Sequence, residues 1–538
     1  MGFTLDPPER LMTAGAPLIT SASKLAADSP ADRADLKAGG ERISVRSPAS
    51  GKVIGQVPVS TAADVADLVR GLRQAQTTWE SGGLETRIGH LLRLRDWLLS
   101  NPHALTKMVQ DETGKPWQEA SIEVPLSCDF INYYCRNAQS FLAGSHPRPH
   151  SLLTASKRLS ITHRPYPVVG VISAWNFPLV LPLMDCLPAL LAGAAVVAKP
   201  SEVTPLALGE VVRAWTEEIG GPAVFACAQG TGEVGRAVVD HVDYVQFTGS
   251  TRSGRAVAVR AAERLIPCSL ELGGKDAAIV LADADLDRAV NGVMWGAFAN
   301  AGQVCLSIER VYVEAPIYDA FVEKLIERVR SLRVGPDDGR FKADVGALAT
   351  ETQLEIVRRQ VDEAVAQGAR AVTGGRPVGT GTFFEPTVLL DVDHSMTCMR
   401  EETFGPTLPV MRVRDVDEAV RLANDSPYGL SATVWTASRR RAEAVAHRLE
   451  VGAVNVNDAF SNFLCFPLPH AGWKSSGIGS RLGGAQGILK YCRPQVMTTP
   501  RLGLRRELTW YPYTARVGRP LLAAMRLLAS RGPRAPRS

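Results

Sequence analysis

Residues 244–254 read YVQFTGSTRSG, an apolar run that gives way at a glycine and a serine to a helical pattern. Three more runs have the same β-rich character: VVGVIS at 168–173, AAVVAK at 194–199 and AAIVLA at 277–282. Segments with helical spacing, such as 205–220, separate them. The alternation of buried strands with helices predicts an α/β protein with a doubly wound parallel sheet.

The ends of these strands carry the first candidate binding residues. Trp175, Lys199 and Gly249 each close or follow a strand, so they are expected at the carboxyl edge of the sheet. Ligands of open α/β sheets bind at this edge. At Gly249 and Ser250 the chain enters a helix, whose free N–H groups and dipole favour an anion. We therefore predict a phosphate site there.

A second glycine-rich segment, GTGEVG at 230–235, matches the dinucleotide pattern GxGxxG. That pattern also requires a carboxylate about twenty residues further on for the ribose. The corresponding stretch reads GSTRSG and contains no carboxylate. We interpret 230–235 as a turn and not as the cofactor site.

The composition excludes several classes of protein. A chain of 538 residues with 45% hydrophobic and 21% charged residues is typical of globular proteins and long enough for two domains. Its nine cysteines are scattered and form no CxxC pair, so we expect no disulfide framework, no metal and a cytoplasmic location. No apolar run is long enough to span a membrane, and no signal sequence is evident.

Two further segments carry the chemistry. FANAGQVC at 298–305 ends in Cys305, and ELGGK at 271–275 begins with Glu271. A thiol is a nucleophile and a carboxylate is a base, so the pair points to covalent chemistry on a carbonyl group. A lone cysteine in apolar surroundings is usually an inert core residue, and only the combination makes Cys305 a candidate.

The chain resembles the aldehyde dehydrogenase superfamily in these two segments and in six others: SAWNFP (173–178), VVAKPSE (196–202), FTGSTRSG (247–254), EETFGP (401–406), NVND (455–458) and SGIG (476–479). Each motif is weak alone, but their order and spacing must hold together. The resemblance extends over residues 41–502. It implies a Rossmann-type cofactor domain, an α/β catalytic domain and a small β oligomerisation element.

The resemblance also implies how the chain is divided. We expect a cofactor domain at 41–151 and 167–273, a catalytic domain at 274–457, an oligomerisation element at 152–166 and 484–502, and a segment at 458–483 that returns to the substrate mouth. A disordered segment at 1–40 and a basic tail at 503–538 are expected outside these ranges. The oligomerisation element implies a homodimer or a homotetramer.

By the same resemblance, Cys305 attacks the carbon of an aldehyde substrate as a thiolate. Asn176 donates its side-chain amide, and Cys305 its backbone N–H, to the oxyanion. Glu271 activates the water that hydrolyses the resulting thioester, and it can also take the thiol proton. The alternatives are that Asn176 is a turn residue before Phe177-Pro178 and that Glu271 caps a turn.

The implied cofactor is NAD, with NADP less favoured. Its pyrophosphate is expected at Gly249 and Ser250, and its adenosine ribose at Lys199 and Glu202. A carboxylate at Glu202 accepts from a 2′-hydroxyl group and repels a 2′-phosphate. Without the resemblance, Lys199 and Glu202 would be read as a solvated charge pair.

Three further residues are assigned to the cofactor. Trp175 lies at the same edge of the sheet. Glu402 is expected to hold the nicotinamide ribose, and Phe404 to pack near the nicotinamide ring. For Phe404 the alternative is an ordinary place in the core.

Two other functions remain open. A CoA-acylating dehydrogenase passes the acyl group to coenzyme A, but such members of the superfamily typically lack a glutamate at position 271. A non-catalytic scaffold at a membrane surface would be expected to have lost Cys305, Glu271 or Asn176. All three are present.

Two positions that bear on the substrate carry no cationic side chain. Succinate semialdehyde dehydrogenases of the superfamily bind the distal carboxylate with two arginines, and the matching positions here are Met184 and Ala299. A carboxylate left unpaired in the channel is unfavourable. Residues 458–470, DAFSNFLCFPLPH, are apolar and aromatic, so we expect an aliphatic or aromatic aldehyde. We expect His470, at the end of this segment, to be structural and not catalytic.

The last 38 residues are basic, with nine arginines and one glutamate, a net charge of +8 against +5 for the whole chain. PLLAAMRLL at 520–528 predicts a short amphipathic helix that begins at Pro520. Such a helix suits the surface of an anionic membrane and a peripheral membrane location, and packing on the enzyme is the alternative. Nucleic acid is not an expected partner, because only the tail is basic.

Overall fold

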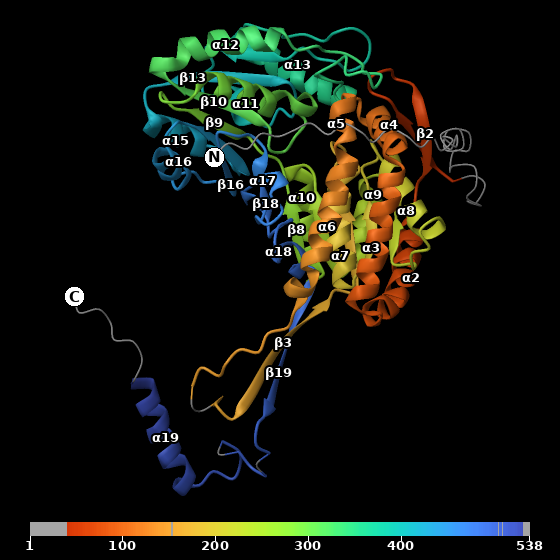
Figure 1. Ribbon diagram of the computed structural model, residues 1–538, viewed down its shortest axis with the longest axis vertical. Coiled ribbons are helices and arrows are strands. Elements are labelled where there is room, and N and C mark those ends of the chain that lie inside the picture. Colours follow the sequence, from red (N-terminus) through yellow and green to blue (C-terminus); the bar gives the residue numbers. More distant parts are fainter. Residues whose placement is uncertain (1–39, 152–153, 504, 508, 531–538) are drawn as a thin grey trace, which may run out of the picture. The chain divides into compact units, whose positions relative to one another are not determined.

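Two predominantly parallel sheets organise the described part of the chain (Figure 1). The computed structural model describes residues 40–151, 154–503, 505–507 and 509–530. Apart from Gly40, the segment at 1–40 that we expect to be disordered lies outside the described residues. The α/β fold class predicted from the strand pattern is confirmed.

The first sheet has six strands in the order β18, β8, β7, β4, β5, β6. They span Gly477–Ile478, Cys268–Glu271, Tyr244–Thr248, Val168–Ile172, Ala195–Lys199 and Phe225–Cys227. Neighbours are parallel except β18, which is antiparallel to β8. The central strands β4, β5 and β7 are buried along their whole length, which explains their continuous apolar sequences.

Helices connect these strands. They include α7 (Val180–Ala192), α8 (Leu206–Glu217), α9 (Gly232–His241) and α10 (Thr251–Glu263). The predicted helix at 205–220 is therefore confirmed as α8. The turn predicted for 230–235 is only half right, because Gly230 has a φ of 148° but the segment from Gly232 onward already forms the first turn of α9.

The second sheet has seven strands in the order β11, β12, β13, β10, β9, β15, β16. They span Arg370–Ala371, Thr387–Leu390, Thr407–Val413, Ile308–Glu314, Asp276–Val280, Ser431–Trp435 and Ala453–Val456. Helices α11 (Leu286–Phe298), α12 (Tyr318–Arg330) and α13 (Glu351–Ala366) lie between its strands in sequence. One hydrophobic core draws on residues 65–272 and 466–492, and a second on residues 277–460.

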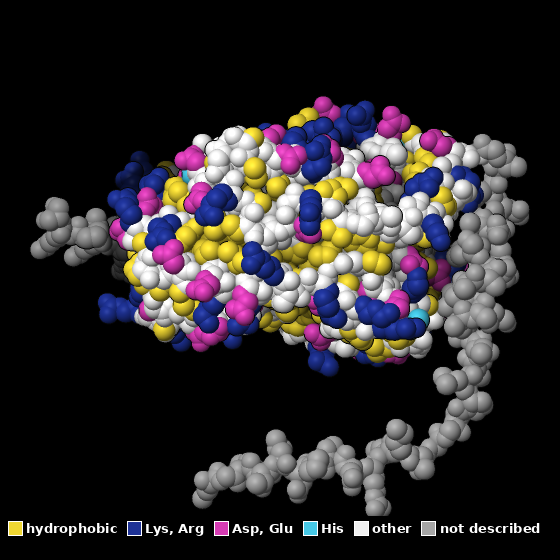
Figure 2. All heavy atoms as spheres, turned by 90° about the horizontal axis from the view of Figure 1, so that it is seen from above, with side chains coloured by type: hydrophobic (Ala, Val, Ile, Leu, Met, Phe, Trp, Pro, Cys, Tyr) yellow, Lys and Arg dark blue, Asp and Glu magenta, His cyan; other side chains and the backbone are white. Residues whose placement is uncertain are grey.

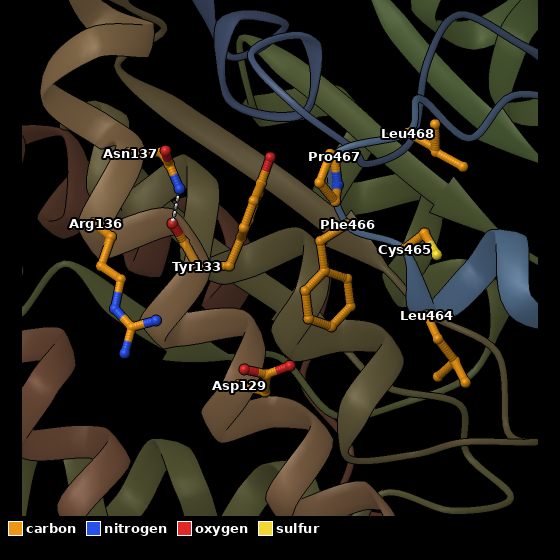
Figure 3. A pocket seen from close by; sticks show the side chains of 9 residues that line it. All are labelled: Asp129, Tyr133, Arg136, Asn137, Leu464, Cys465, Phe466, Pro467 and Leu468. Atoms are coloured by element: carbon orange, nitrogen blue, oxygen red, sulfur yellow. Dashed lines mark hydrogen bonds between the residues drawn. The ribbon is translucent and has the colours of Figure 1, made fainter. Parts of the chain in front are cut away.

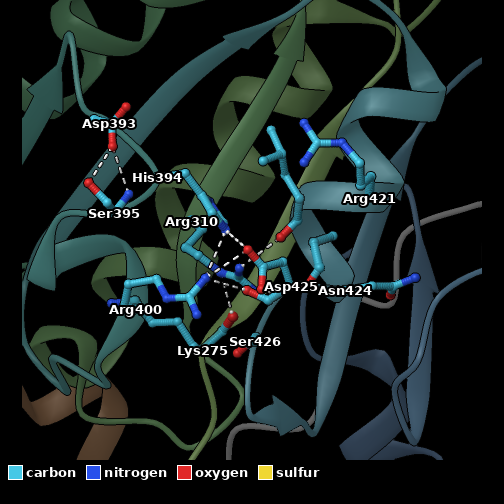
Figure 4. A network of polar contacts seen from close by, with 12 residues as sticks. Lys275, Arg310, Asp393, His394, Ser395, Arg400, Arg421, Asn424, Asp425 and Ser426 are labelled. Carbon is cyan, nitrogen blue, oxygen red and sulfur yellow. Dashed lines mark hydrogen bonds and ion pairs between the residues drawn. The ribbon is translucent and has the colours of Figure 1, made fainter.

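A buried arginine joins two elements of the second sheet's domain (Figure 4). Arg310 on β10 donates to the backbone oxygens of Leu422 and Ala423 at 3.2 and 3.0 Å. These residues lie in the last turn of α15 (Val416–Asn424), where carbonyl groups lack partners within the helix and a cation is favourable. Arg310 also donates to the backbone oxygen of Lys275 at 2.8 Å, which ties this network to the end of the ELGGK segment.

Two strands form a separate antiparallel ribbon, β3 (Lys157–Pro165) with β19 (Cys492–Pro500). They fall within the two ranges expected to form the oligomerisation element. After β19 the chain enters helix α19 (Ala515–Ser530), none of whose residues is buried. The helix begins five residues before Pro520, so the predicted start is wrong. Pro520 removes only one helical hydrogen bond, which does not break the helix. Val517 and Leu521, one turn apart on either side of Pro520, lie on the same apolar face.

The charges of the surface are mixed. Figure 2 shows one face on which basic and acidic side chains are interspersed. Among the described residues, no helix is long and apolar enough to cross a membrane.

Candidate active site

Cys305 lies at the end of a constrained loop. The loop follows α11 through a short 3-10 turn, Ala299–Gly302, in which Asn300 and Ala301 have φ angles of 51° and 54°. These left-handed conformations are unusual for residues with a side chain, so neighbouring contacts must hold them. At Gly302 a Cβ atom would lie 2.1 Å from the backbone oxygen of Gly405, which explains why only glycine fits against the EETFGP segment.

Asn176 is the first of those contacts. Its Nδ2 donates to the backbone oxygen of Gln303 at 3.0 Å, two residues before Cys305. In return, Nδ2 of Asn300 donates to the backbone oxygen of Asn176 at 3.1 Å. Lys115 donates to the same oxygen at 2.7 Å, and its buried ion pair with Glu123 fixes it in place. The structure thus brings Asn176 to the cysteine loop, as the sequence predicts.

Glu271 is the last residue of β8 and is buried. Gly274, three residues after it, lies against the cysteine: a Cβ atom there would be 2.8 Å from the backbone oxygen of Cys305. Burial raises the pKa of Glu271 to about 8, an effect that Arg481 and Lys490 oppose. The carboxyl group therefore changes charge near neutral pH, as a general base must.

The Cys305 thiol is neutral in its present surroundings. Burial raises its pKa to about 12, and the Arg481 guanidinium counteracts this while the Glu271 carboxylate adds to it. The thiolate is the nucleophilic form, so the thiol must lose its proton to a base. Among the carboxyl groups, Glu271 has the largest effect on the pKa of this thiol, ahead of Asp276 and Glu402.

The predicted cofactor residues meet at the carboxyl edge of the first sheet. Lys199 is the last residue of β5, and its Nζ lies 3.3 Å from Oε2 of Glu202. Gly249 follows β7, and its N–H donates to the backbone oxygen of Glu271 at 3.0 Å. Ser250 caps α10 by accepting from the N–H of Ser253.

This edge has unsatisfied hydrogen-bonding groups that suit a dinucleotide. The buried hydroxyl oxygens of Ser173 and Thr248, at the ends of β4 and β7, have no partner among the described residues. The free N–H groups at the start of α10 face the same edge and favour a phosphate. Ribose hydroxyl and phosphate groups are the ligand chemistry that these donors and acceptors fit.

Glu402 and Phe404 lie in the loop before β13. Oε1 of Glu402 accepts from the N–H of Gly274 at 2.9 Å, so this side chain reaches the ELGGK segment. Burial, together with the charge of Glu309, raises the pKa of Glu402 to about 8. Phe404 has a φ of 53° and packs edge-on against Trp175, with the ring centroids 5.3 Å apart. The two aromatic residues predicted to bind the cofactor therefore lie side by side.

A pocket of about 550 Å³ opens between a helix and a loop of the described chain (Figure 3). One wall is the face of α6 (Glu123–Leu142) that carries Asp129, Tyr133 and Arg136. The other is the segment 464–468, LCFPL, which includes the exposed Cys465. This second wall belongs to the apolar segment that the family resemblance predicts near the substrate mouth, and it leads two residues later to His470.

The comparisons with known proteins decide the family. The model of the aldehyde dehydrogenase family matches residues 36–497. The chain belongs to the aldehyde dehydrogenase family. It is an NAD(P)-dependent aldehyde dehydrogenase, which oxidises an aldehyde to a carboxylic acid. This confirms the family, the class of enzyme and the class of substrate expected from the motifs.

Similar aldehyde dehydrogenases differ in the substrates that their names give. A "Putative succinate-semialdehyde dehydrogenase" of Mycolicibacterium smegmatis, whose name specifies NADP(+), is 42% identical over 84% of this chain and 88% of its own length. A "4,4'-diapolycopene aldehyde oxidase" of Methylomonas is 40% identical over 88% of both proteins. The solved structure titled "Putative Aldehyde Dehydrogenase PutA" from Anabaena variabilis has a TM-score of 0.84 at 37% identity and covers 88% of this chain and 100% of its own.

The sequence did not reveal the buried charges that surround Glu271 in this dehydrogenase. Arg481 and Asp185 form an ion pair with 3.0 Å between Nη2 and Oδ2, and Lys490 lies 4.0 Å from the same carboxylate. His470, for which the sequence predicts a structural role, has its Nε2 3.5 Å from Oε2 of Glu271. One feature of the sequence could have indicated that His470 and Arg481 lie near Glu271: they stand on either side of the SGIG motif at 476–479.

Proposed function

We propose that this aldehyde dehydrogenase releases its product by hydrolysis, with Cys305 as nucleophile and Glu271 as base. The observation that carries the proposal is the arrangement of three segments around Cys305. The amide of Asn176 is bonded two residues before it, and the backbone after Glu271 lies against its carbonyl. Nucleophile, oxyanion donor and base are thus available in one buried site.

The reaction begins when Glu271 takes the Cys305 proton and the thiolate attacks the carbonyl carbon. The amide of Asn176 and the backbone N–H of Cys305 donate to the oxyanion that forms. The bound dinucleotide supplies the acceptor for the hydride that leaves this carbon. Glu271 passes this first proton to solvent and then takes a second one from water, which attacks the thioester on Cys305; that second proton returns to the sulfur when the thioester breaks. The carboxylic acid leaves and the thiol is restored.

For the cofactor we propose NAD in preference to NADP. Glu202 lies three residues after the end of β5 and forms an ion pair with Lys199. A carboxylate is therefore held where the adenosine ribose is expected. A 2′-phosphate would be repelled by this charge. Gly249 and Ser250 at the start of α10 would hold the pyrophosphate. Glu402 and the Trp175–Phe404 pair would bind the nicotinamide end.

For the substrate we propose an aldehyde with an apolar chain. The Met184 side chain is buried among apolar neighbours, and Ala299 offers no charge. The wall formed by Leu464, Phe466 and Leu468 supports an aliphatic or aromatic chain in the pocket. An acid semialdehyde is the alternative, since Arg136 also lines the pocket.

The decisive experiment measures NAD and NADP reduction by the purified full chain with hexanal, benzaldehyde and succinate semialdehyde, without coenzyme A. Cys305→Ala should abolish turnover, whereas Cys465→Ala, which removes the exposed thiol of the pocket, should leave the Cys305 chemistry intact. Turnover that needs added coenzyme A would replace hydrolysis by acyl transfer. Absence of turnover under both conditions would favour a non-catalytic scaffold.

We also propose that the enzyme is a homodimer or a homotetramer, assembled through the ribbon of β3 and β19. Most of β19 is exposed, including Val496 and Met497, so the ribbon offers backbone and apolar surface to another subunit. Light scattering of the full chain tests the subunit number.

We also propose a cofactor domain at 41–151 and 167–273 and a catalytic domain at 274–457, a division that the two hydrophobic cores support.

We propose that α19 docks on an anionic membrane surface. Its arginines, Arg516, Arg519 and Arg526, share one side of the helix, and Val517, Leu521, Met525 and Leu528 share the other. No residue of α19 is buried, and the exposed rings of Trp510, Tyr511 and Tyr513 precede it. Basic and apolar faces with flanking aromatic residues match a surface of acidic headgroups. The enzyme would then be cytoplasmic and peripheral to the membrane.

Co-sedimentation with vesicles tests this proposal. The full chain should bind vesicles that contain phosphatidylserine more than vesicles of phosphatidylcholine alone. A chain ending at Leu502, and a full chain with Arg516, Arg519 and Arg526 changed to Gln, should both lose that preference. Equal recovery of all three proteins would show that the tail does not bind the membrane surface, and would leave packing on the enzyme as the alternative.

A further inference from the structure

His470 contacts the residue proposed as the catalytic base. Its Nε2 lies 3.5 Å from Oε2 of Glu271, and the side chains are 3% and 5% exposed. Neither Nε2 of His470 nor Oε1 of Glu271 has a hydrogen-bond partner among the described residues. A buried imidazole nitrogen without a partner, beside a buried carboxyl group with one unpartnered oxygen, is a costly arrangement unless the two groups interact.

The fold directs His470 to this place through two backbone pairings. The His470 N–H donates to the backbone oxygen of Leu482, and the Arg481 N–H donates to that of His470, both at 2.8 Å. The chain between them forms β18, where Gly477 is the antiparallel partner of Glu271. The imidazole ring also packs edge-on against Phe463, with the centroids 6.2 Å apart. Register and packing therefore both fix the ring beside β8.

We propose that His470 is a positioning residue for Glu271. Its Nε2–H donates to the carboxylate and keeps it in the orientation that accepts a proton from water. The contact of 3.5 Å is longer than a normal hydrogen bond, and such contacts commonly shorten when substrate binds. The inference rests on the proposed role of Glu271 and adds the group that orients it.

The charge of His470 is compatible with this role. Burial, with the charges of Arg481 and Lys490, lowers the pKa of His470 to about 3, so the ring is neutral and acts as a donor without a full charge. Four other titratable groups face Glu271: Asp185 from α7, Arg481 and Lys490 near the C-terminal end of the chain, and the Cys305 thiol. Arg481 and Lys490 favour the Glu271 carboxylate through charge, and His470 adds a directional bond.

The test compares His470→Phe with His470→Gln. Phenylalanine keeps the packing against Phe463 but removes the donor, and glutamine restores an N–H donor on a side chain of similar reach. Loss of a donor to the carboxylate should raise the midpoint of the rising limb of kcat against pH by about one unit, and lower kcat near pH 7 about tenfold with KM unchanged. His470→Gln should recover most of this loss. Phe463→Leu, which touches the ring but not Glu271, is the packing control.

A second readout separates this inference from the proposed function. Hydrolysis of p-nitrophenyl acetate, followed without a dinucleotide, reports acylation and deacylation of Cys305 directly. His470→Phe should show a burst of about one equivalent of nitrophenol and slow turnover after it. If the wild type hydrolyses the ester but oxidises no aldehyde, the proposed function fails while the positioning role is still measured. The positioning role is overturned if the pH profiles of His470→Phe for aldehyde oxidation and for ester hydrolysis both match those of the wild type. It is also overturned if Phe463→Leu causes the same shift of the midpoint.

Discussion

Nη2 of Arg481 lies 3.0 Å from Oδ2 of Asp185, and both side chains are 1% exposed. Removing one partner of such a pair leaves an uncompensated charge in the interior. We expect Arg481→Met to lower the free energy of unfolding by about 3 to 5 kcal/mol. The double variant with Asp185→Leu should regain most of this loss, because neither member of the pair is then left buried without the other. Urea denaturation of the wild type, the two single variants and the double variant measures the coupling energy between Arg481 and Asp185.

The exposed ion pair of Arg439 and Glu443, whose side chains are 92% and 58% exposed, supplies the control. Arg439→Met should change the free energy of unfolding by less than about 0.5 kcal/mol. Strictly additive effects of the two buried substitutions would show that Asp185 and Arg481 do not depend on each other.

The pH dependence should report Glu271. Its pKa is raised from 4.5 to about 8, so the carboxylate needed for hydrolysis appears only as the pH rises through that value. We expect kcat to increase with pH along a single-proton limb centred near 8. In Glu271→Gln, pre-steady-state measurements should show a burst of reduced dinucleotide followed by little turnover if hydrolysis is the step that is lost. Equal loss of the burst and of the turnover would mean that Glu271 is needed first to deprotonate Cys305.

The same titration affects stability with a definite sign. The folded state holds the Glu271 proton more tightly than the unfolded chain does, so protonation of Glu271 stabilises the folded state. This stabilisation is complete below the unfolded pKa of 4.5 and is lost as the pH rises towards 8. Glu271→Gln removes the titration. The difference in unfolding free energy between the wild type and Glu271→Gln should therefore shift against the wild type across this interval, as measured by urea denaturation at several pH values.

The cofactor preference should depend on Glu202. Replacing it with Ala removes the repulsion of a 2′-phosphate and an acceptor for the 2′-hydroxyl, so the ratio of kcat/KM for NAD to that for NADP should fall by about tenfold or more. Glu233→Ala, in the first turn of α9, serves as the matched loss of charge. An unchanged ratio in Glu202→Ala would remove this residue from the ribose site.

The substrate class can be decided at Arg136, the only arginine or lysine that lines the pocket among the described residues. If the substrate is apolar, Arg136→Ala should alter kcat/KM for hexanal less than about threefold. If an acid semialdehyde is the true substrate, the loss of a charge-assisted contact should reduce kcat/KM for succinate semialdehyde at least tenfold. Asp129→Ala, on the same face of α6, controls for the removal of charge from the rim.

Much of the fold follows from local sequence, because parallel strands buried on both faces must be continuous apolar runs. The runs at 168–173, 194–199, 244–249 and 277–282 became β4, β5, β7 and β9. Their polar ends were placed correctly at one edge for the same reason, since side chains after parallel strands meet there. The proximity of Asn176 to the Cys305 loop was likewise expected and is present.

The surroundings of Glu271 could not be read in this way. His470 and Arg481 flank a short strand that pairs across about two hundred residues of sequence, and no local periodicity reports such a pairing. A histidine next to apolar residues therefore looked like a core residue. The sequence predicts that α19 begins at Pro520 because proline favours the first turn of a helix, whereas the one hydrogen bond lost at Pro520 does not end the helix.

The antiparallel pairing of β18 with β8 has a consequence for biosynthesis. The strand that pairs with Glu271, and the Arg481 and Lys490 side chains that favour its charged form, are synthesised well after Cys305. A nascent polypeptide that already contains Cys305 therefore lacks the finished surroundings of its base. The surroundings of Glu271 are complete only when residues 470–490 have folded back onto the first sheet, so we expect turnover at Cys305 only after that stage of synthesis.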